Sequence, residues 1–374
     1  MNFDYTEDQK SLKDEARRYL NAVSPITVVR AVLEADGDGC DSGLWKQIGE
    51  QGWCAAAIPE SYGGLEMGYV ELCALAEELG RALAPVPFAS TVYCFAEALL
   101  AVGTDAQKEE LLPQVCSGDL IGTLAVSEGA GVLTPERIAT RFADGRISGA
   151  KVPVVDGLVA GKAVVLAAAD TGPGLFLVDL GGEGITREKV STIDPTRGEA
   201  RIVFDDAPAQ PLGDGVDGIA ALSGIEDRAA VLMAFEQLGG ADRCLEMARD
   251  YALERYAFGR QIGSYQAIKH KLADVFVKNE VARANAYYGA WALSTDAPEL
   301  PLAAAAARVA ACEAYWHAAK ENIQTHGGIG FTWEADCHFF YRRARHLGLV
   351  IGSPRDWKRR LATRLEARVA AEVD

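Results

Sequence analysis

The segment RYAFGRQIGSYQ, at residues 255–266, separates two long runs of helical periodicity and so indicates the architecture of the chain. Apolar residues recur at helical spacing over 225–255 before it and over 265–293 after it. Gly259 and the polar residues around it predict a turn between the two helices. Long helices joined by a short connection usually pack antiparallel, and a third periodic segment at 302–324 extends the pattern to a helical bundle.

The regions before the bundle have two different compositions, which predict two further domains. Residues 1–120 show helical periodicity, and Thr6 with Gln9 three residues later forms a capping-box pattern. Residues 121–212 contain short β-branched and aromatic runs separated by Gly, Asp and Pro, which predict a small antiparallel β domain. The predicted fold class is α+β, with an N-terminal helical domain, a middle β domain and a C-terminal helical bundle over 213–374.

The composition indicates a folded protein that does not bind polyanions. The chain has 374 residues, 49% of them hydrophobic, which supplies a large core and argues against disorder. There are 37 Lys and Arg against 53 Asp and Glu, and the net charge of −16 argues against nucleic acid and anionic membranes as partners. Eight scattered cysteines without a C-x-x-C pair indicate no metal or redox motif. With an N-terminus that lacks an apolar stretch, they predict a cytoplasmic protein.

The segment at 255–266 is also the first of three candidate sites. It offers a cation in Arg255, an aromatic plane in Phe258 and an amide in Gln266. An arginine can hold a phosphate bidentately, and a phenyl ring can cover a flat heterocycle. The alternative is a simple helix–helix turn, with Phe258 in the core and Gln266 on the surface. Spacing alone favours that structural alternative.

The second candidate is the glycine-rich stretch at 324–331, where a predicted helix ends. Gln324 precedes Gly327, Gly328 and a third glycine. Glycines allow positive φ angles and let backbone N–H groups approach a ligand closely. The alternative is an ordinary glycine C-cap, although three glycines exceed what a cap needs, so both interpretations stay open. His326 beside them is more typical of a structural residue.

The third candidate lies at 124–131, where the predicted β domain begins. It contains Val126 and Ser127, followed by Glu128 and two glycines. The hydroxyl and the backbone amides of this stretch could bind the polar edge of a heterocycle. By itself the stretch is only a weak glycine-loop signal.

Taken together, the three segments indicate a protein family much more specifically than any one of them does. The chain resembles the acyl-CoA dehydrogenase family. Its members are flavoproteins that oxidise an acyl-CoA thioester across the α and β carbons. The resemblance covers essentially the whole chain and includes similar stretches at 53–64, 77–81 and 193–208. The strongest matches are 255–266 and 324–328.

The resemblance implies an N-terminal helical domain, a middle β domain and a C-terminal four-helix bundle. It places FAD between the β domain and the bundle, with Val126 and Ser127 facing the flavin ring. Contacts to the pyrophosphate and adenine half of an FAD held mainly by a neighbouring subunit are implied for Arg255, Phe258, Gln266, Gln324, Gly327 and Gly328. A shared FAD implies a homo- or heteromeric dimer or tetramer. The family also implies an acyl-CoA substrate and an electron-transfer flavoprotein as electron acceptor.

The catalytic base is where the sequence first departs from the commonest family pattern. The reaction needs a carboxylate that removes the α-proton while hydride leaves the β-carbon for the flavin. Many members place a Glu where Ile351 stands here, and that side chain cannot accept a proton. Some relatives carry the base on the first long helix of the bundle, immediately before an Arg, and the matching residue is Asp227 before Arg228. The alternative is that Asp227, with Glu226, is a first-turn residue that complements the helix dipole.

The β domain shows a second departure. Pro153 and Val155 stand where the family usually has an aromatic residue and a Thr near the flavin. The pair Glu128-Gly129 replaces the usual Glu-Pro, and the expected Gly-Ser-Asp is absent after Gly131. These differences weaken the FAD site that this chain's own β domain would supply.

Two hypotheses follow for the function. In the first, the chain is an FAD-dependent acyl-CoA dehydrogenase of lipid degradation that forms the trans-2-enoyl-CoA with Asp227 as base. In the second, it is a non-catalytic or half-site subunit of a heteromeric dehydrogenase, for example for bulky or steroid side-chain acyl-CoA, and completes a partner's FAD site. A flavin oxidase or monooxygenase relative is a third alternative.

Overall fold

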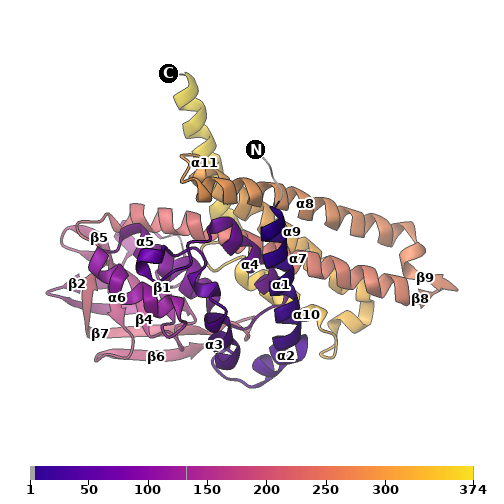
Figure 1. Cartoon of the computed structure of the whole chain (residues 1–374), viewed down its shortest axis with the longest axis horizontal. Coiled ribbons are helices and arrows are strands. Elements are labelled where there is room, and N and C mark those ends of the chain that lie inside the picture. The colour runs from indigo at the N-terminus through magenta and orange to yellow at the C-terminus, as the bar shows by residue number, and fades with distance from the viewer. Residues whose placement is uncertain (1–4, 132, 374) are drawn as a thin grey trace. The chain divides into compact units, whose positions relative to one another are not determined.

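The computed structural model of the chain describes residues 5–131 and 133–373 (Figure 1). The residues form two compact units, and each is discontinuous in the sequence. The first, here called the helical unit, contains Met1–Val29, Tyr69–Ala84 and Ala230–Asp374. The second, the sheet unit, contains Arg30–Gly68 and Pro85–Ala229. The three-domain division at residues 120 and 212 stays a prediction.

The helical unit consists mainly of long α-helices, as its periodicity predicts. They are α1 (Glu7–Val23), α4 (Tyr69–Arg81), α7 (Gly218–Glu254), α8 (Gln266–Ser294), α9 (Leu300–His326), α10 (Cys337–Leu347) and α11 (Pro354–Val373). Residues 218–229 of α7 belong to the sheet unit. Both α10 and α11 pack against α9.

The contact between α8 and α9 is close because small residues line it. A Cβ added to Gly289 in α8 would lie 3.5 Å from the Cβ of Ala307 in α9. The same added Cβ would lie 3.1 Å from Val231 in α7. Ala303, in the same alanine-rich stretch as Ala307, is fully buried. Side chains without bulk therefore let the three helices approach each other.

A predicted cap and buried charge pairs fix the N-terminal helix α1. The Thr6 hydroxyl accepts from the Gln9 backbone N–H at 3.2 Å, and the Gln9 side-chain oxygen accepts from the Thr6 N–H at 2.9 Å, which confirms the capping box. Lys13 Nζ lies 2.6 Å from the Glu77 carboxylate of α4, and Arg283 of α8 lies 2.9 Å from the same group. Although burial opposes ionisation, these two cations hold the pKa of Glu77 below its usual value.

A seven-stranded sheet is the centre of the sheet unit. Its strands are β1 (Gly122–Ala125), β2 (Arg141–Ala143), β3 (Arg146–Val155), β4 (Lys162–Ala169), β5 (Gly172–Asp179), β6 (Ile185–Val190) and β7 (Glu199–Pro211). The order is β1-β4-β2-β3-β7-β5, with β6 beside β7 and β4 also paired with β5. The expectation of a wholly antiparallel domain is corrected, because β1 and β2 each run parallel to β4. The chain reaches β4 from β1 through two intervening strands, which is long enough for a parallel crossover.

Short helices and turns complete the sheet unit. They are α2 (Ile26–Glu34), which begins in the helical unit, α3 (Ser42–Glu50), a π-helix (Ala89–Ala96), α5 (Glu97–Val102) and α6 (Asp105–Cys116). Residues 89–102, within the region of predicted helical periodicity, therefore form a π-helix followed directly by α5. In Figure 1, α5 and α6 lie over the strands β1 and β4.

Two apolar clusters cover the two faces of the sheet. Val164 and Leu166 of β4 belong to the cluster formed with the helices. Val165 and Ala167 of the same strand belong to the second cluster. This alternation follows from the period of two in a strand, and it buries β4 on both faces.

The eight cysteines are all free thiols, and seven of them are buried. Burial raises the pKa of the half-buried Cys40 to about 12 and that of Cys337 to about 11. No helix in residues 5–131 and 133–373 is long and apolar enough to cross a membrane.

Candidate functional site

A buried lysine holds the segment that follows β1. The Lys151 side chain, on β3, is fully buried, and its ammonium donates to the carbonyl oxygen of Val126 at 3.1 Å. The same ammonium lies 2.7 Å from Oε1 of Glu128. The backbone N–H of Val152 donates to the carbonyl of Ser127 at 2.8 Å. Val126 and Ser127, both half-buried, are therefore attached to β3 through their carbonyl groups.

Glu128 has a structural role that its surrounding sequence does not reveal. Its carboxylate accepts the backbone N–H of Ala139 at 2.7 Å and of Thr140 at 3.0 Å, in addition to the Lys151 ammonium. Although burial opposes ionisation, these bonds lower the pKa of Glu128 to about 2. The carboxylate is therefore charged at neutral pH and neutralises the buried Lys151.

Asp227 lies in the part of α7 that belongs to the sheet unit. The residue is 3% exposed, and Glu226 is 9% exposed. The helix begins at Gly218 and has no acidic residue in its first turn. The alternative that Asp227 is a first-turn residue is therefore wrong, because its position well inside the helix removes it from the dipole's positive end.

The neighbour of Asp227 is fixed by an ion pair. Arg228 Nε donates to Oε2 of Glu97 in α5 at 2.6 Å. The Glu97 side chain is only 2% exposed, so this pair is largely shielded from water. Since Arg228 follows Asp227 directly, the pair restrains the turn of α7 that carries the predicted base.

The positions that depart from the family pattern carry no ionisable group. Ile351 is 6% exposed, and its carbonyl accepts the Trp357 indole N–H at 2.9 Å. Pro153 on β3 is exposed, and Val155 is half-buried at the end of the same strand. None of these three side chains can exchange a proton with a substrate.

The predicted turn after α7 is a tight hairpin with an exposed aromatic residue at its tip. It pairs β8 (Tyr256–Ala257) with β9 (Arg260–Gln261). Phe258 has φ 51° and Gly259 has φ 80°, and the Phe258 side chain is 96% exposed. The alternative that placed Phe258 in the core is therefore wrong. A two-residue hairpin loop requires positive φ angles, and a bulky residue adopts them at a cost in strain.

Contacts within the turn keep this strained conformation in place. The Tyr265 hydroxyl donates to the carbonyl of Ala257 at 3.0 Å. The guanidinium of Arg260 stacks over the Tyr265 ring at 3.9 Å. Arg255 lies exposed just before the hairpin, and Gln266 is the exposed first residue of α8.

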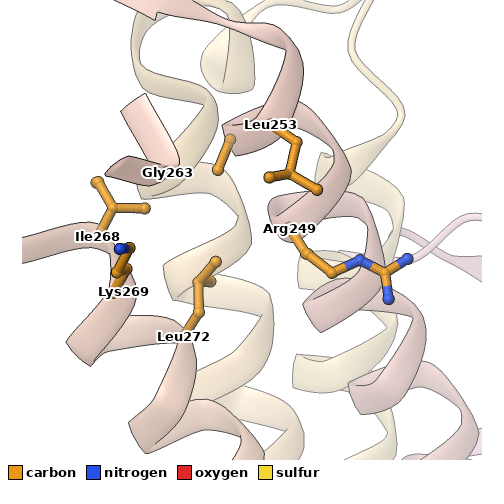
Figure 2. A pocket seen from close by; sticks show the side chains of 7 residues that line it. Arg249, Leu253, Gly263, Ile268, Lys269 and Leu272 are labelled. Atoms are coloured by element: carbon orange, nitrogen blue, oxygen red, sulfur yellow. The ribbon is translucent and has the colours of Figure 1, made fainter. Parts of the chain in front are cut away.

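A small cavity of about 230 Å³ lies between the end of α7 and the beginning of α8 (Figure 2). The side chains of Leu253, Ile268 and Leu272 lie around it. It is also lined by Arg249, Ala252, Gly263 and Lys269. The two cations on this lining belong to the same end of the helical unit as Arg255.

The glycine-rich segment follows α9, and its three glycines have different roles. Gly327 caps the helix with φ 64° and ψ −137°, a conformation that only glycine adopts readily. A Cβ on Gly330 would lie 2.6 Å from the Ile323 carbonyl oxygen, so this glycine serves close packing. A Cβ on Gly328 would have no described atom within 4 Å. Gly328 and the exposed Gln324 thus have open space around them.

An aromatic stack connects the glycine-rich segment to the hairpin end of α7. The rings of Tyr251 in α7 and His326 in α9 lie 4.3 Å apart and nearly parallel. His326 Nδ1 also lies 2.8 Å from the carbonyl oxygen of Asn322. His326 is therefore a structural residue, as its isolated position in the sequence suggests.

The predicted site residues fall into two groups, one in each unit. The sheet unit carries Val126, Ser127 and Asp227, and the helical unit carries Arg255, Phe258, Gln266, Gln324, Gly327 and Gly328. In the helical group, an exposed cation, an exposed aromatic ring and a glycine with space beyond it fit the anionic and flat parts of an FAD.

Both terminal parts of the chain match models of one protein family. Residues 6–119 match the acyl-CoA dehydrogenase N-terminal domain, and residues 217–355 match the acyl-CoA dehydrogenase C-terminal domain. Together these matches cover more than half of the chain.

Individual relatives agree with this assignment. The acyl-CoA dehydrogenase IpdE2 of Mycobacterium tuberculosis is 35% identical over 95% of this chain and 96% of its own length. A solved structure of a variant of the steroid ACAD Tcur3481-Tcur3483 is 30% identical, with a TM-score of 0.88 over 97% of this chain and 99% of that one. The ChsE4-ChsE5 complex from Mycobacterium tuberculosis is 26% identical, with a TM-score of 0.89 over 98% and 99%. The chain belongs to the acyl-CoA dehydrogenase family, whose members are FAD-dependent oxidoreductases that act on the CH–CH bond of acyl-CoA thioesters.

Proposed function

We propose that this chain dehydrogenates its acyl-CoA with Asp227 as the base that takes the α-proton. The observation that carries this proposal is a buried aspartate, Asp227, that is only 3% exposed and lies well inside α7, in a chain with Ile351 at the usual base position. FAD, when bound, accepts the hydride from the β-carbon. Burial keeps bulk water away from the carboxylate and helps hold it in one position relative to the thioester.

The ion pair beside Asp227 supports this role. Arg228 is bound to the buried Glu97 at 2.6 Å, so the backbone next to Asp227 is restrained from a second element of the sheet unit. A base must be held within hydrogen-bond distance of the proton it removes. Asp is one methylene shorter than Glu, which makes the position of the helix turn more important.

The decisive experiment measures α-proton exchange of a bound acyl-CoA in deuterated water. The Asp227→Asn variant loses this exchange by a factor of about 10² to 10⁴, which is the usual contribution of a general base. Glu226→Gln is the matched control, because it removes a neighbouring carboxylate that is also mostly buried. Unchanged exchange in Asp227→Asn, with FAD still bound, would contradict the assignment.

We further propose that a second subunit of the same family covers the hairpin end of the helical unit and shares its FAD. Phe258 is 96% exposed, Phe331 is 84% exposed and Tyr256 is 63% exposed. Tyr256 and Phe258 lie on the strained hairpin, and Phe331 ends the glycine-rich segment after α9. Exposed apolar residues are typical of a contact surface. Arg255, Gln266, Gln324, Gly327 and Gly328 then contact the diphosphate and adenine half of the FAD held by that subunit.

The composition of the assembly is open to a direct test. Two of the similar structures are named for pairs of proteins, ChsE4 with ChsE5 and Tcur3481 with Tcur3483. If this chain is purified alone as a yellow protein with one FAD per chain, a homomer with complete sites is supported. A colourless chain that becomes yellow only with a co-purified second polypeptide supports a heteromer instead.

The acyl group and the electron acceptor are also proposals. Because a relative with 30% identity is described as a steroid enzyme, we propose a bulky acyl group, such as a steroid side chain, as the substrate. Turnover of a steroid side-chain acyl-CoA much faster than that of butyryl-CoA would support this, and the reverse preference would contradict it. We propose an electron-transfer flavoprotein as the acceptor, which predicts slow reaction of the reduced enzyme with oxygen.

A further inference from the structure

Lys151 is an unusual residue for the interior of a sheet. Its side chain is fully buried, and burial lowers its pKa although Glu128 opposes this change. A charged lysine without water is costly unless it is paired and hydrogen-bonded. Its two described partners are the Glu128 carboxylate at 2.7 Å and the Val126 carbonyl at 3.1 Å. The second of these bonds is directed at the backbone of the segment that follows β1.

The bond to Val126 fixes the direction of a neighbouring donor. A peptide unit is planar and trans, so the carbonyl of Val126 and the N–H of Ser127 point in opposite directions. Because the carbonyl points at Lys151, the Ser127 N–H points away from it. Among residues 5–131 and 133–373, this N–H has no hydrogen-bond acceptor.

The next peptide unit is held in the same way. The Ser127 carbonyl accepts from the Val152 N–H at 2.8 Å, so consecutive carbonyls are bound to consecutive residues of β3. Glu128 adds two bonds to the backbone at residues 139 and 140. The segment is therefore restrained from both sides, and its direction does not depend on a ligand.

We propose that Lys151 is a positioning residue that holds the Ser127 N–H toward the polar edge of the flavin ring. This inference rests on FAD binding by this chain, with Val126 and Ser127 at the flavin ring as the family resemblance implies. Because Glu128 neutralises the ammonium, Lys151 acts through the orientation of the backbone and not through its own charge. A preorganised donor at a ring atom that gains negative charge on reduction favours the reduced form.

The first test compares variants in the complete FAD-binding assembly. Lys151→Met alone leaves Glu128 as an uncompensated buried carboxylate, so the double variant Lys151→Met/Glu128→Gln removes both charges together. Lys162→Met is the control, because Lys162 on β4 of the same sheet has a looser ion pair with Asp179 at 3.6 Å. The readouts are the dissociation constant of FAD, the flavin absorption spectrum, the flavin reduction potential and the Tm without FAD.

The expected result separates positioning from simple stability. The double variant keeps a cooperative unfolding transition but binds FAD about tenfold more weakly or worse, which corresponds to about 1.4 kcal/mol or more. Its flavin spectrum changes and its reduction potential becomes more negative, whereas the Lys162→Met control matches the wild type in all four readouts. A folded double variant with the wild-type spectrum, potential and affinity overturns the inference.

A second measurement uses only the wild-type chain. Hydrogen exchange of the Ser127 amide is compared before and after FAD is removed from the assembly. Protection of this amide by FAD supports the inference, and exchange that FAD does not change overturns it. If the wild-type assembly binds no FAD at all, the proposed function fails together with this inference. If it binds FAD but Ser127 and the variants are unaffected, only the role of Lys151 fails.

Discussion

Two regions predicted to contact FAD, the segment 126–128 through Val126 and Ser127 and the hairpin through Phe258, are built in opposite ways. In the first, two carbonyl groups and a carboxylate are bound from within the sheet unit, and a fully buried lysine binds one of those carbonyls and the carboxylate. In the second, a phenyl ring is 96% exposed on a backbone with φ 51°. The first is stabilised by the fold that contains it, whereas the second keeps an unfavourable conformation and an unburied aromatic ring.

Because of this difference, the two regions respond differently to substitution. A change inside the bound segment affects the folded chain itself, because it leaves a buried charge without its partner. A change at the exposed hairpin leaves the separate chain almost unaffected and affects only what contacts it. Four changes to the chain test this contrast.

Removing the carboxylate of Glu128 has the largest effect on stability. Glu128→Ala leaves the Lys151 ammonium buried without its ion-pair partner, and we expect a loss of about 3 kcal/mol in the free energy of unfolding. Denaturant unfolding of the chain without FAD measures this loss. Glu188→Ala is the control, because its pair with Arg201 lies at the surface of the same unit. If Glu128→Ala were as stable as that control, the segment 126–128 would not depend on its buried ion pair, and the contrast with the hairpin would be contradicted.

Removing the Phe258 ring separates assembly from stability. Phe258→Ala leaves the free energy of unfolding within about 0.5 kcal/mol of the wild type, because the ring is almost fully exposed. FAD retention and subunit association weaken about 30-fold if the ring is a central contact worth about 2 kcal/mol. Gel filtration and FAD titration measure the second effect. Equal FAD affinity in Phe258→Ala and the wild type would show that the Phe258 ring does not contact FAD.

The contribution of Glu128 to stability is expected to depend on pH in the acidic range. Its pKa is lowered from 4.5 to about 2, so the stabilisation it provides is fully present above the unfolded value. The stabilisation is lost as the pH falls from there toward the folded value. The difference in Tm between the wild type and Glu128→Gln is therefore constant above about pH 5.5 and shrinks below it. A Tm difference that stays constant on acidification down to the folded pKa contradicts this reasoning.

Relieving the strain in the hairpin changes the free energy of unfolding least, and it increases this free energy where the other substitutions lower it or leave it unchanged. Phe258→Asn places Asn-Gly in a two-residue loop that needs two positive φ angles. We expect a gain of about 0.5–1 kcal/mol in the free energy of unfolding, together with the same loss of FAD retention as in Phe258→Ala. Calorimetry on the separate chain measures the gain. No gain in stability would show that the Phe258 backbone stores no strain.

The sequence predicts most of the elements because their signals are local. The helical periodicity within residues 1–120 corresponds to helices such as α4, and the β-branched runs within 121–212 correspond to strands such as β4. Periodicity alone places the start of α7 too late, at 225, although Asp217 accepts the N–H groups of Ile219 and Ala220 and is a recognisable cap. A helix that begins at that cap excludes Asp227 from the first turn.

The contacts of the site could not be predicted, because they join distant residues. The pair Lys151–Glu128 spans 23 positions, and the pair Glu97–Arg228 spans 131. The exposure of Phe258 could not be predicted either, because the same sequence is compatible with a buried phenylalanine and with one on a surface loop. Only the folded chain shows which aromatic residues are covered, because burial is a property of the tertiary structure.

The buried thiols give each unit its own chemical reporter of opening. Cys54 and Cys94 lie in the sheet unit, and Cys244 and Cys312 lie in the helical unit. A thiol reagent modifies only the exposed thiolate, so each of these residues reacts at the rate at which its surroundings open. Pulsed labelling followed by mass spectrometry can therefore time the unfolding of the two units separately, without any engineered probe.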